Sequence, residues 1–319
     1  MSEDDEMKSL EGKSWIPSGN MIEGIHYFLE SPIKQSEEEN PAPQPLVVFI
    51  HGIGFYNFGF QNLAKRLRAQ GYRTLVYDNI GLGHSVLPTH DSESVLFGGQ
   101  GHVEQLRTLM QKLDLLSTKY SIVCHSMGGG ITLLYANKYA EEIDSIIFLS
   151  PAGLMDLPLA LRFVRSAPSC LHGYIKSFIR MPIEAKKLPS VRTDFVNQSH
   201  PNLEFVEQSL LLMHDNNHQA LEAFFQSALH FPLSSLQSEA MNLSASNVRV
   251  CVLWGELDTV TPLLPNLSRW VEAMKDRHAF FAHQTFTDTA HLFFLEKEDD
   301  VASSIIIFLS HSNSHSTSL

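Results

Sequence analysis

The sequence predicts an α/β fold in which a mostly parallel, doubly wound sheet carries a helical insertion near its middle. Two observations indicate this class. Apolar runs of strand length alternate with stretches of helical periodicity up to residue 150. The alternation stops after Pro151 and resumes at Val248. A chain of 319 residues is long enough for one large domain with such an insertion.

The first half of the chain supplies most of the predicted sheet. Residues 46–50 form a continuous apolar run, which is typical of a strand covered on both faces. The helix after it is stopped by Gly71. In order, we expect a strand at 22–30, a strand at 46–50, a helix at 57–70, a strand at 73–77, a helix at 103–117, a strand at 120–124, a helix at 131–140 and a strand at 145–149.

The second half departs from this rhythm and then returns to it. Residues 154–240 show helical periodicity and scattered prolines, whereas strands are expected at 248–254 and 279–286 and a helix at 299–309. The predicted organisation is a loose acidic N-terminus over residues 1–20, a core over 21–153 and 241–310, a helical cap over 154–240 and a frayed tail over 311–319.

Composition excludes several classes of protein. A net charge of −12 argues against general nucleic-acid binding. No apolar run is long enough to span a membrane, and the acidic N-terminus resembles neither a secretory signal nor a transit peptide. The three cysteines give no disulfide framework. We therefore expect a reduced, cytoplasmic protein, and the absence of nucleotide, flavin or metal motifs predicts no cofactor.

The charge is unevenly distributed. Residues 160–192 hold seven basic side chains and a single acid, Glu184. One interpretation is a cap that packs its apolar face on the sheet edge and keeps its charges in water. The alternative is an amphipathic lid that makes peripheral contact with lipid interfaces or steers anionic substrates.

Three polar residues follow three predicted strands. Ser126 stands in the sequence Cys124-His125-Ser126-Met127-Gly128-Gly129, between a strand and a helix, as a nucleophile at a tight turn would. Asp258 and His291 each end a later strand, and the carboxyl ends of parallel strands share one edge.

A serine needs an adjacent base that is held by a third group, so these residues are the candidate catalytic set. The alternatives are a helix N-cap for Ser126, an Asx turn for Asp258 with Glu256 as a rival acid, and an ordinary histidine for His291, one of 16 in the chain.

Four motifs in this order resemble the α/β-hydrolase superfamily. They are residues 78–85 (Asp-Asn-Ile-Gly-Leu-Gly-His-Ser), the segment around Ser126, residues 254–258 (Trp-Gly-Glu-Leu-Asp) and residues 290–291 (Ala-His). The core around Ser126 and the insertion resemble the monoacylglycerol lipase and carboxylesterase branch. Cys124 departs from the glycine that is usual there, and we expect its sulfur to strain the turn.

The resemblance implies a function and further residues. The backbone N–H groups of Ile53 and Met127 would form an oxyanion hole. We interpret Asp78, His84 and Ser85 as structural residues that hold the loop beside the site, and His51 as a residue that orients the oxyanion loop. The implied activity is hydrolysis of carboxylic esters, such as monoacylglycerols, through an acyl-enzyme and a Ser126–His291–Asp258 triad. The alternatives are cleavage of an amide, thioester or C–C bond on the same fold, or a catalytically silent binding protein.

Overall fold

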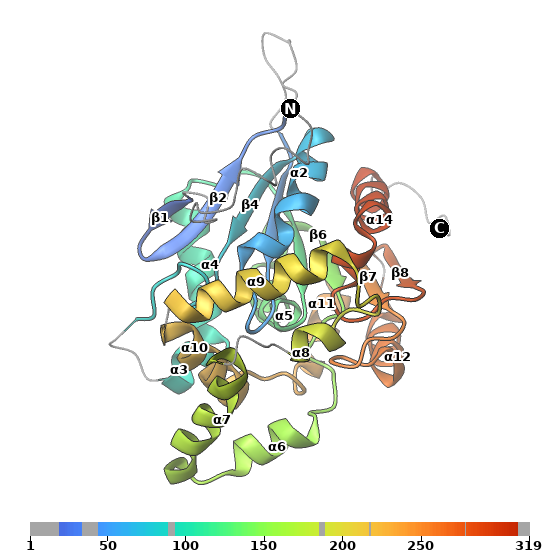
Figure 1. Cartoon of the computed structure of the whole chain (residues 1–319). Coiled ribbons are helices and arrows are strands. Elements are labelled where there is room, and N and C mark those ends of the chain that lie inside the picture. Colours follow the sequence, from blue (N-terminus) through green and yellow to red (C-terminus); the bar gives the residue numbers. More distant parts are fainter. Residues whose placement is uncertain are drawn as a thin grey trace.

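The computed structural model describes residues 19–33, 44–88, 93–184, 189–216, 218–277 and 279–311 (Figure 1). Most of the expected acidic N-terminus and frayed tail therefore lies outside the described residues. An eight-stranded sheet occupies the centre, in the order β1-β2-β4-β3-β5-β6-β7-β8. The strands are β1 (Asn20–Ile22), β2 (Ile25–Glu30), β3 (Leu46–Ile50), β4 (Arg73–Tyr77), β5 (Tyr120–His125), β6 (Ile143–Leu149), β7 (Arg249–Gly255) and β8 (Phe281–Phe286).

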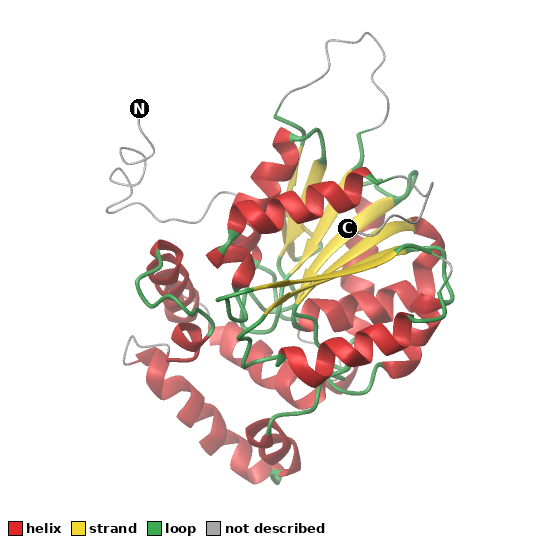
Figure 2. Cartoon of the chain, turned by 90° about the vertical axis from the view of Figure 1, so that its right-hand side faces the viewer, coloured by secondary structure: helices red, strands yellow, loops and turns green. Residues whose placement is uncertain are grey.

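Helices lie on both sides of the sheet (Figure 2). They are η1 (Asn57–Phe60), α2 (Gln61–Ala69), α3 (Glu93–Phe97), α4 (Gln100–Lys112), α5 (Met127–Tyr139), η2 (Ala140–Glu142), α6 (Leu159–Ser166), η3 (Ser169–Leu171), α7 (His172–Glu184), α8 (Pro189–Thr193), α9 (Pro201–Asn216), α10 (His218–His230), α11 (Gln237–Ser244), α12 (Leu263–Met274), α13 (Phe293–Glu296) and α14 (Glu298–Ser310).

The apolar run of β3 shows why the sheet is covered on both faces. Val47 and Phe49 belong to a buried cluster with residues of α2 and α14, whereas Val48 and Ile50 belong to a second cluster with residues of α4, α5 and α12. Successive side chains of a strand point to opposite faces, so an uninterrupted apolar run buries both. The strands from β4 to β8 are parallel, and the doubly wound α/β fold is confirmed.

One predicted strand, at the N-terminal edge of the sheet, is wrong. The expected single strand over residues 22–30 is a hairpin, because Glu23 and Gly24 both have positive φ angles, 49° and 77°. Two such residues form the type of turn that joins antiparallel strands directly. β2 in turn pairs antiparallel with β4, so this edge departs from the parallel arrangement.

The segment between β6 and β7 is helical throughout its described elements, from α6 to α11. α10 contacts α3, while α11 packs against α5 and α12 and so belongs with the core layers. α6 and α7 lie at the bottom of the view, outside the helices that flank the sheet (Figure 1). We call residues 154–236 the cap below.

Candidate active site

Ser126, Asp258 and His291 lie in three loops at one edge of the sheet. Ser126 separates β5 from α5, Asp258 follows β7, and His291 follows β8. β5 to β8 are consecutive parallel neighbours, so their carboxyl ends lie at a common edge. All three side chains are buried.

The turn at Ser126 is tight and strained. Ser126 has φ 53° and ψ −120°, a conformation that costs energy for any residue other than glycine. A Cβ added at Gly128 would lie 2.2 Å from the Ile50 carbonyl oxygen, and one added at Gly52 would lie 3.0 Å from the Ser126 Cβ. The glycines therefore allow the turn and the loop after β3 to approach each other closely.

The positive φ angle of this turn belongs to Ser126 and not to Cys124. The Cys124 thiol is buried in the cluster on the α5 side of the sheet, with its Sγ 3.6 Å from the Ile147 carbonyl oxygen. Burial raises the pKa of this thiol far above its ordinary value. Cys124 is accordingly a packing residue and not a nucleophile.

Asp258 and His291 form a hydrogen-bonded pair. His291 Nδ1 lies 2.8 Å from Asp258 Oδ2. The other carboxylate oxygen accepts from the N–H groups of Val260, at 2.8 Å, and Thr261, at 2.9 Å. The Thr261 hydroxyl donates to Asp258 Oδ2 at 2.8 Å. With Nδ1 as the donor to Asp258, Nε2 of the neutral imidazole is the free acceptor.

The hydrogen-bonded pair of Asp258 and His291 shifts the pKa of both of its members. Burial opposes ionisation of both groups, but the attraction between them outweighs it. The pKa of Asp258 is therefore lowered and that of His291 is raised. An imidazole with a raised pKa is a stronger proton acceptor. A serine hydroxyl is a weak nucleophile and needs such an acceptor beside it in order to react.

His125 connects the serine turn to the His291 loop. Its Nε2 lies 3.1 Å from the His291 carbonyl oxygen, and the two rings are 4.5 Å apart between centroids. Burial lowers the pKa of His125 well below its ordinary value, so the ring is neutral and donates through Nε2. Within the described residues, the Ser126 hydroxyl itself forms no hydrogen bond.

The loop after β3 is held against Ser126 by His51. Its Nδ1 lies 2.8 Å from the Gly52 carbonyl oxygen, and its Nε2 accepts from the Asn79 N–H at 2.8 Å. Burial lowers the pKa of His51 and keeps it neutral. Ile53 follows this anchored pair, and Met127 begins α5, where the first N–H groups have no partner within the helix. Both candidate oxyanion donors thus stand in segments that adjoin Ser126.

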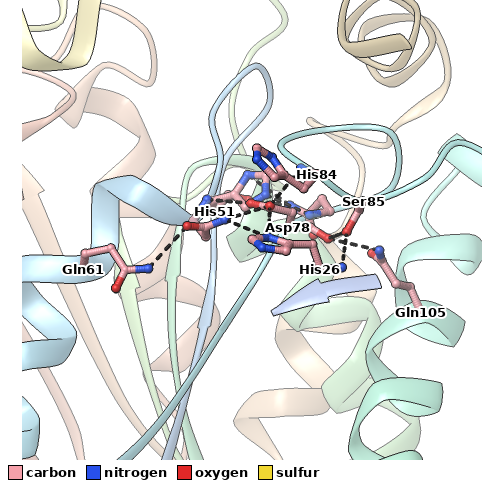
Figure 3. Close-up of polar contacts among 9 residues, drawn as sticks. His26, His51, Gln61, Asp78, His84, Ser85 and Gln105 are labelled. Atoms are coloured by element: carbon pink, nitrogen blue, oxygen red, sulfur yellow. Dashed lines mark hydrogen bonds and ion pairs between the residues drawn. The ribbon is translucent and has the colours of Figure 1, made fainter. Parts of the chain in front are cut away.

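Asp78 ties several elements together beside this loop (Figure 3). Its carboxylate accepts from the Asn57 N–H and side-chain amide, both at 2.7 Å, from His26 Nδ1 at 2.8 Å and from the His84 N–H at 3.0 Å. Burial opposes its ionisation, but the hydrogen bond from His26 and the other favourable contacts prevail and lower its pKa. The Ser85 hydroxyl donates to the Asp78 carbonyl oxygen at 2.6 Å.

His26, Asp78 and His84 lie close enough together to be considered as metal ligands. Their candidate ligand atoms fall within 4.8 Å of one another, the one such group within the described residues. The Asp78 oxygens, however, already accept four hydrogen bonds from protein donors. The arrangement is that of a satisfied structural network.

Asp194 is a site residue that the sequence analysis missed. It follows α8 in the cap, and its carbonyl oxygen accepts from the Leu292 N–H at 3.1 Å. Burial raises the pKa of its carboxyl group to about 6, against the influence of His291. Once ionised, Asp194 raises the pKa of His291 in turn. The sequence feature that could have pointed to Asp194 is that it is one of only two acidic residues between residues 160 and 203.

Comparison with known proteins identifies similar chains. A family model described as serine aminopeptidase, S33, matches residues 41–298. Lipase 3 of Moraxella sp. is 26% identical over 226 residues, which are 70% of this chain and 66% of that protein. Lipase 1 of Psychrobacter immobilis is 24% identical over 225 residues, 70% of this chain and 65% of that protein. The chain thus spans just under two thirds of the length of these relatives.

A solved structure with the same fold is an esterase from Exiguobacterium antarcticum. It has a TM-score of 0.68 and 19% sequence identity, and the match covers 90% of this chain and 96% of the esterase. At this level of identity the likeness supports the fold alone.

The charge on Asp194 generates the first testable prediction. Asp194→Asn removes a negative charge that favours protonated His291, so the pKa of His291 should fall. If neutral His291 is required for activity, the acidic limb of the pH–rate profile should move to lower pH. NMR titration of the imidazole measures the shift directly. Asp300→Asn removes an exposed charge in the first turn of α14 and should leave the pKa of His291 unchanged. An unchanged pKa of His291 in Asp194→Asn would show that the Asp194 charge does not reach His291.

Proposed function

The chain belongs to the serine aminopeptidase S33 family of α/β-hydrolase-fold serine hydrolases, and we propose that it hydrolyses carboxylic esters through an acyl-enzyme formed on Ser126. The observation that carries the proposal is the buried Asp258–His291 hydrogen bond, 2.8 Å long, at the sheet edge where Ser126 also lies. The lipase relatives support esters as the bond that is cleaved.

Acylation begins with proton transfer. His291 Nε2 takes the Ser126 hydroxyl proton as Oγ attacks the ester carbonyl carbon, and the carbonyl electron pair moves to oxygen. The N–H groups of Ile53 and Met127 would donate to this oxyanion, aided at Met127 by the positive end of the α5 dipole. The C–O bond to the alcohol then breaks, and the departing oxygen receives the proton from His291.

Deacylation repeats these steps with water. His291 takes a proton from water as its oxygen attacks the acyl carbon, and the resulting intermediate collapses to release the carboxylic acid. Ser126 Oγ leaves and recovers its proton from His291. Asp258 stays ionised throughout, holds the Nδ1–H tautomer and stabilises the imidazolium that forms in each half-reaction.

The surroundings of the oxyanion loop favour an uncharged acyl group. A Cβ added at Gly54 would lie 2.9 Å from a ring carbon of Phe224, and one added at Gly81 would lie 2.8 Å from the Ala223 Cβ. Phe224 of α10 therefore covers the loop after β3, and Ala223 of the same helix covers the loop after β4. Monoacylglycerols or short- to medium-chain esters are the substrate class that we propose for this lining.

Cleavage of an amide is the second candidate, because the family model is described by an aminopeptidase activity. The same residues could act on either bond, since both pass through a tetrahedral oxyanion. A substrate panel separates the two: a preference for p-nitrophenyl esters over matched p-nitroanilides that exceeds their intrinsic difference in reactivity supports the ester assignment, and the reverse supports the amide.

The nucleophile is tested by labelling with a fluorophosphonate probe. We expect the wild-type protein to be labelled and Ser126→Ala to be unlabelled, because the probe phosphonylates an activated serine hydroxyl. Ser303→Ala removes a hydroxyl from the exposed face of α14 and should be labelled like wild type. Folded wild-type protein that resists labelling would contradict the proposal and favour a catalytically silent binding protein.

The acid is tested by Asp258→Asn, for which we expect a loss of about 10⁴-fold in kcat, as in other triads where the imidazole tautomer is lost. The amide oxygen of the introduced asparagine can still accept from the Val260 and Thr261 N–H groups, so thermal stability should change little. Glu256→Gln is the matched control, since Glu256 is exposed in the same loop. A rate for Asp258→Asn near that of wild type would assign the acid role to another carboxylate.

A further inference from the structure

Helices α6 and α7 and the short η3 between them present large apolar side chains to solvent. Leu159 and Phe163 of α6 are 81% and 63% exposed, and Tyr174 and Phe178 of α7 are 77% and 76% exposed. Each pair is four residues apart, which places its members on one face of the helix. With Leu171 of η3, we call these residues the cap patch.

The patch is unusual for this molecule. Phe163, Tyr174 and Phe178 are the three aromatic side chains that are exposed in the part of the chain that the structure describes. Single exposed aliphatic residues elsewhere need no explanation, but aromatic residues gathered on adjacent elements mark an interaction surface.

The other side of these helices is fixed to the protein. Arg165 donates to the carbonyl oxygens of Ala228, at 2.9 Å, and Phe231, at 2.5 Å. Lys176 pairs with Glu222 of α10 at 2.9 Å. The apolar residues of the patch therefore face outward because α6 and α7 use their opposite sides for attachment. Helices α6 and α7 form the outermost layer of the cap (Figure 1).

The charge of this segment is opposite to that of the chain. Residues 159–183 contain four basic residues and no acid, in a protein of net charge −12. Arg162 and Arg180 are exposed on the same two helices as the apolar residues. Aromatic and leucine side chains combined with arginine and lysine are typical of helices that lie in the interface of an anionic membrane.

We propose that the cap patch docks the protein on an anionic lipid surface. The aromatic and leucine side chains enter the boundary between headgroups and acyl chains, while Arg162 and Arg180 lie at the level of the lipid phosphates. Contact of this kind is peripheral, and none of the helices in the described ranges is long and apolar enough to cross a bilayer. The proposal stands on the exposed surface and does not depend on the esterase assignment.

Vesicle co-sedimentation of the full chain tests the proposal. We expect binding to phosphatidylcholine vesicles in which about one lipid in three is phosphatidylglycerol, and weaker binding to pure phosphatidylcholine. Phe163→Ser combined with Phe178→Ser should weaken binding by about 10-fold or more, because both rings leave the bilayer boundary. Met241→Ser is the matched control, since Met241 is 59% exposed on α11, a helix that packs against α5 and α12 and contributes no residue to the patch.

The charges are tested separately. Arg162→Gln combined with Arg180→Gln should reduce binding to the anionic vesicles by about 10-fold and have little effect on neutral ones. Added salt should weaken the wild type more than this variant, because screening acts on the charges that the variant lacks. Circular dichroism and thermal unfolding show whether each variant is folded.

Three results would overturn the proposal. They are failure of folded wild-type protein to bind anionic vesicles, equal binding by the Phe163/Phe178 variant, and a concentration-dependent dimer that the same variant abolishes while vesicles bind neither protein. The last result would assign the patch to a second copy of the chain. Ser126→Ala should bind vesicles like wild type, so loss of catalysis and loss of membrane binding are distinguishable.

Discussion

The buried carboxylate of Asp78 is the group on which the geometry beside Ser126 depends. Through its four accepted hydrogen bonds it joins β2, η1 and the loop that follows β4. The next residue, Asn79, holds His51 and thereby the loop that approaches the serine. A buried carboxylate is stable only when hydrogen-bond donors surround its oxygens. The Asp78 carboxylate therefore fixes the positions of these elements relative to one another.

The charge around His291 depends on two buried acids, Asp258 and Asp194. Asp258 contacts His291 directly and is surrounded by donors, so it remains a carboxylate. Asp194 acts on the same imidazole from the cap, but its partial desolvation raises its pKa to about 6. One acid is therefore permanently charged near neutrality, while the other changes charge within the range in which histidine titrates.

The sequence was most informative where a local pattern coincides with a topological rule. Ser126, Asp258 and His291 could be assigned to one edge because each follows a strand of a parallel sheet, whereas their catalytic roles stay predictions. The strand over residues 22–30 was wrong because alternation does not reveal that Glu23 adopts a positive φ angle. The roles of Asn57 and Asp194 were missed because their partners are distant in sequence, and no periodic pattern encodes such contacts.

One backbone hydrogen bond has a mechanical consequence. The Leu292 N–H donates to the Asp194 carbonyl oxygen, so the residue after the imidazole is tied to the insertion that covers the sheet edge. An outward swing of that insertion must either break this link or drag the imidazole loop with it. Entry of a molecule past the insertion and the position of the His291 imidazole are therefore coupled through this hydrogen bond.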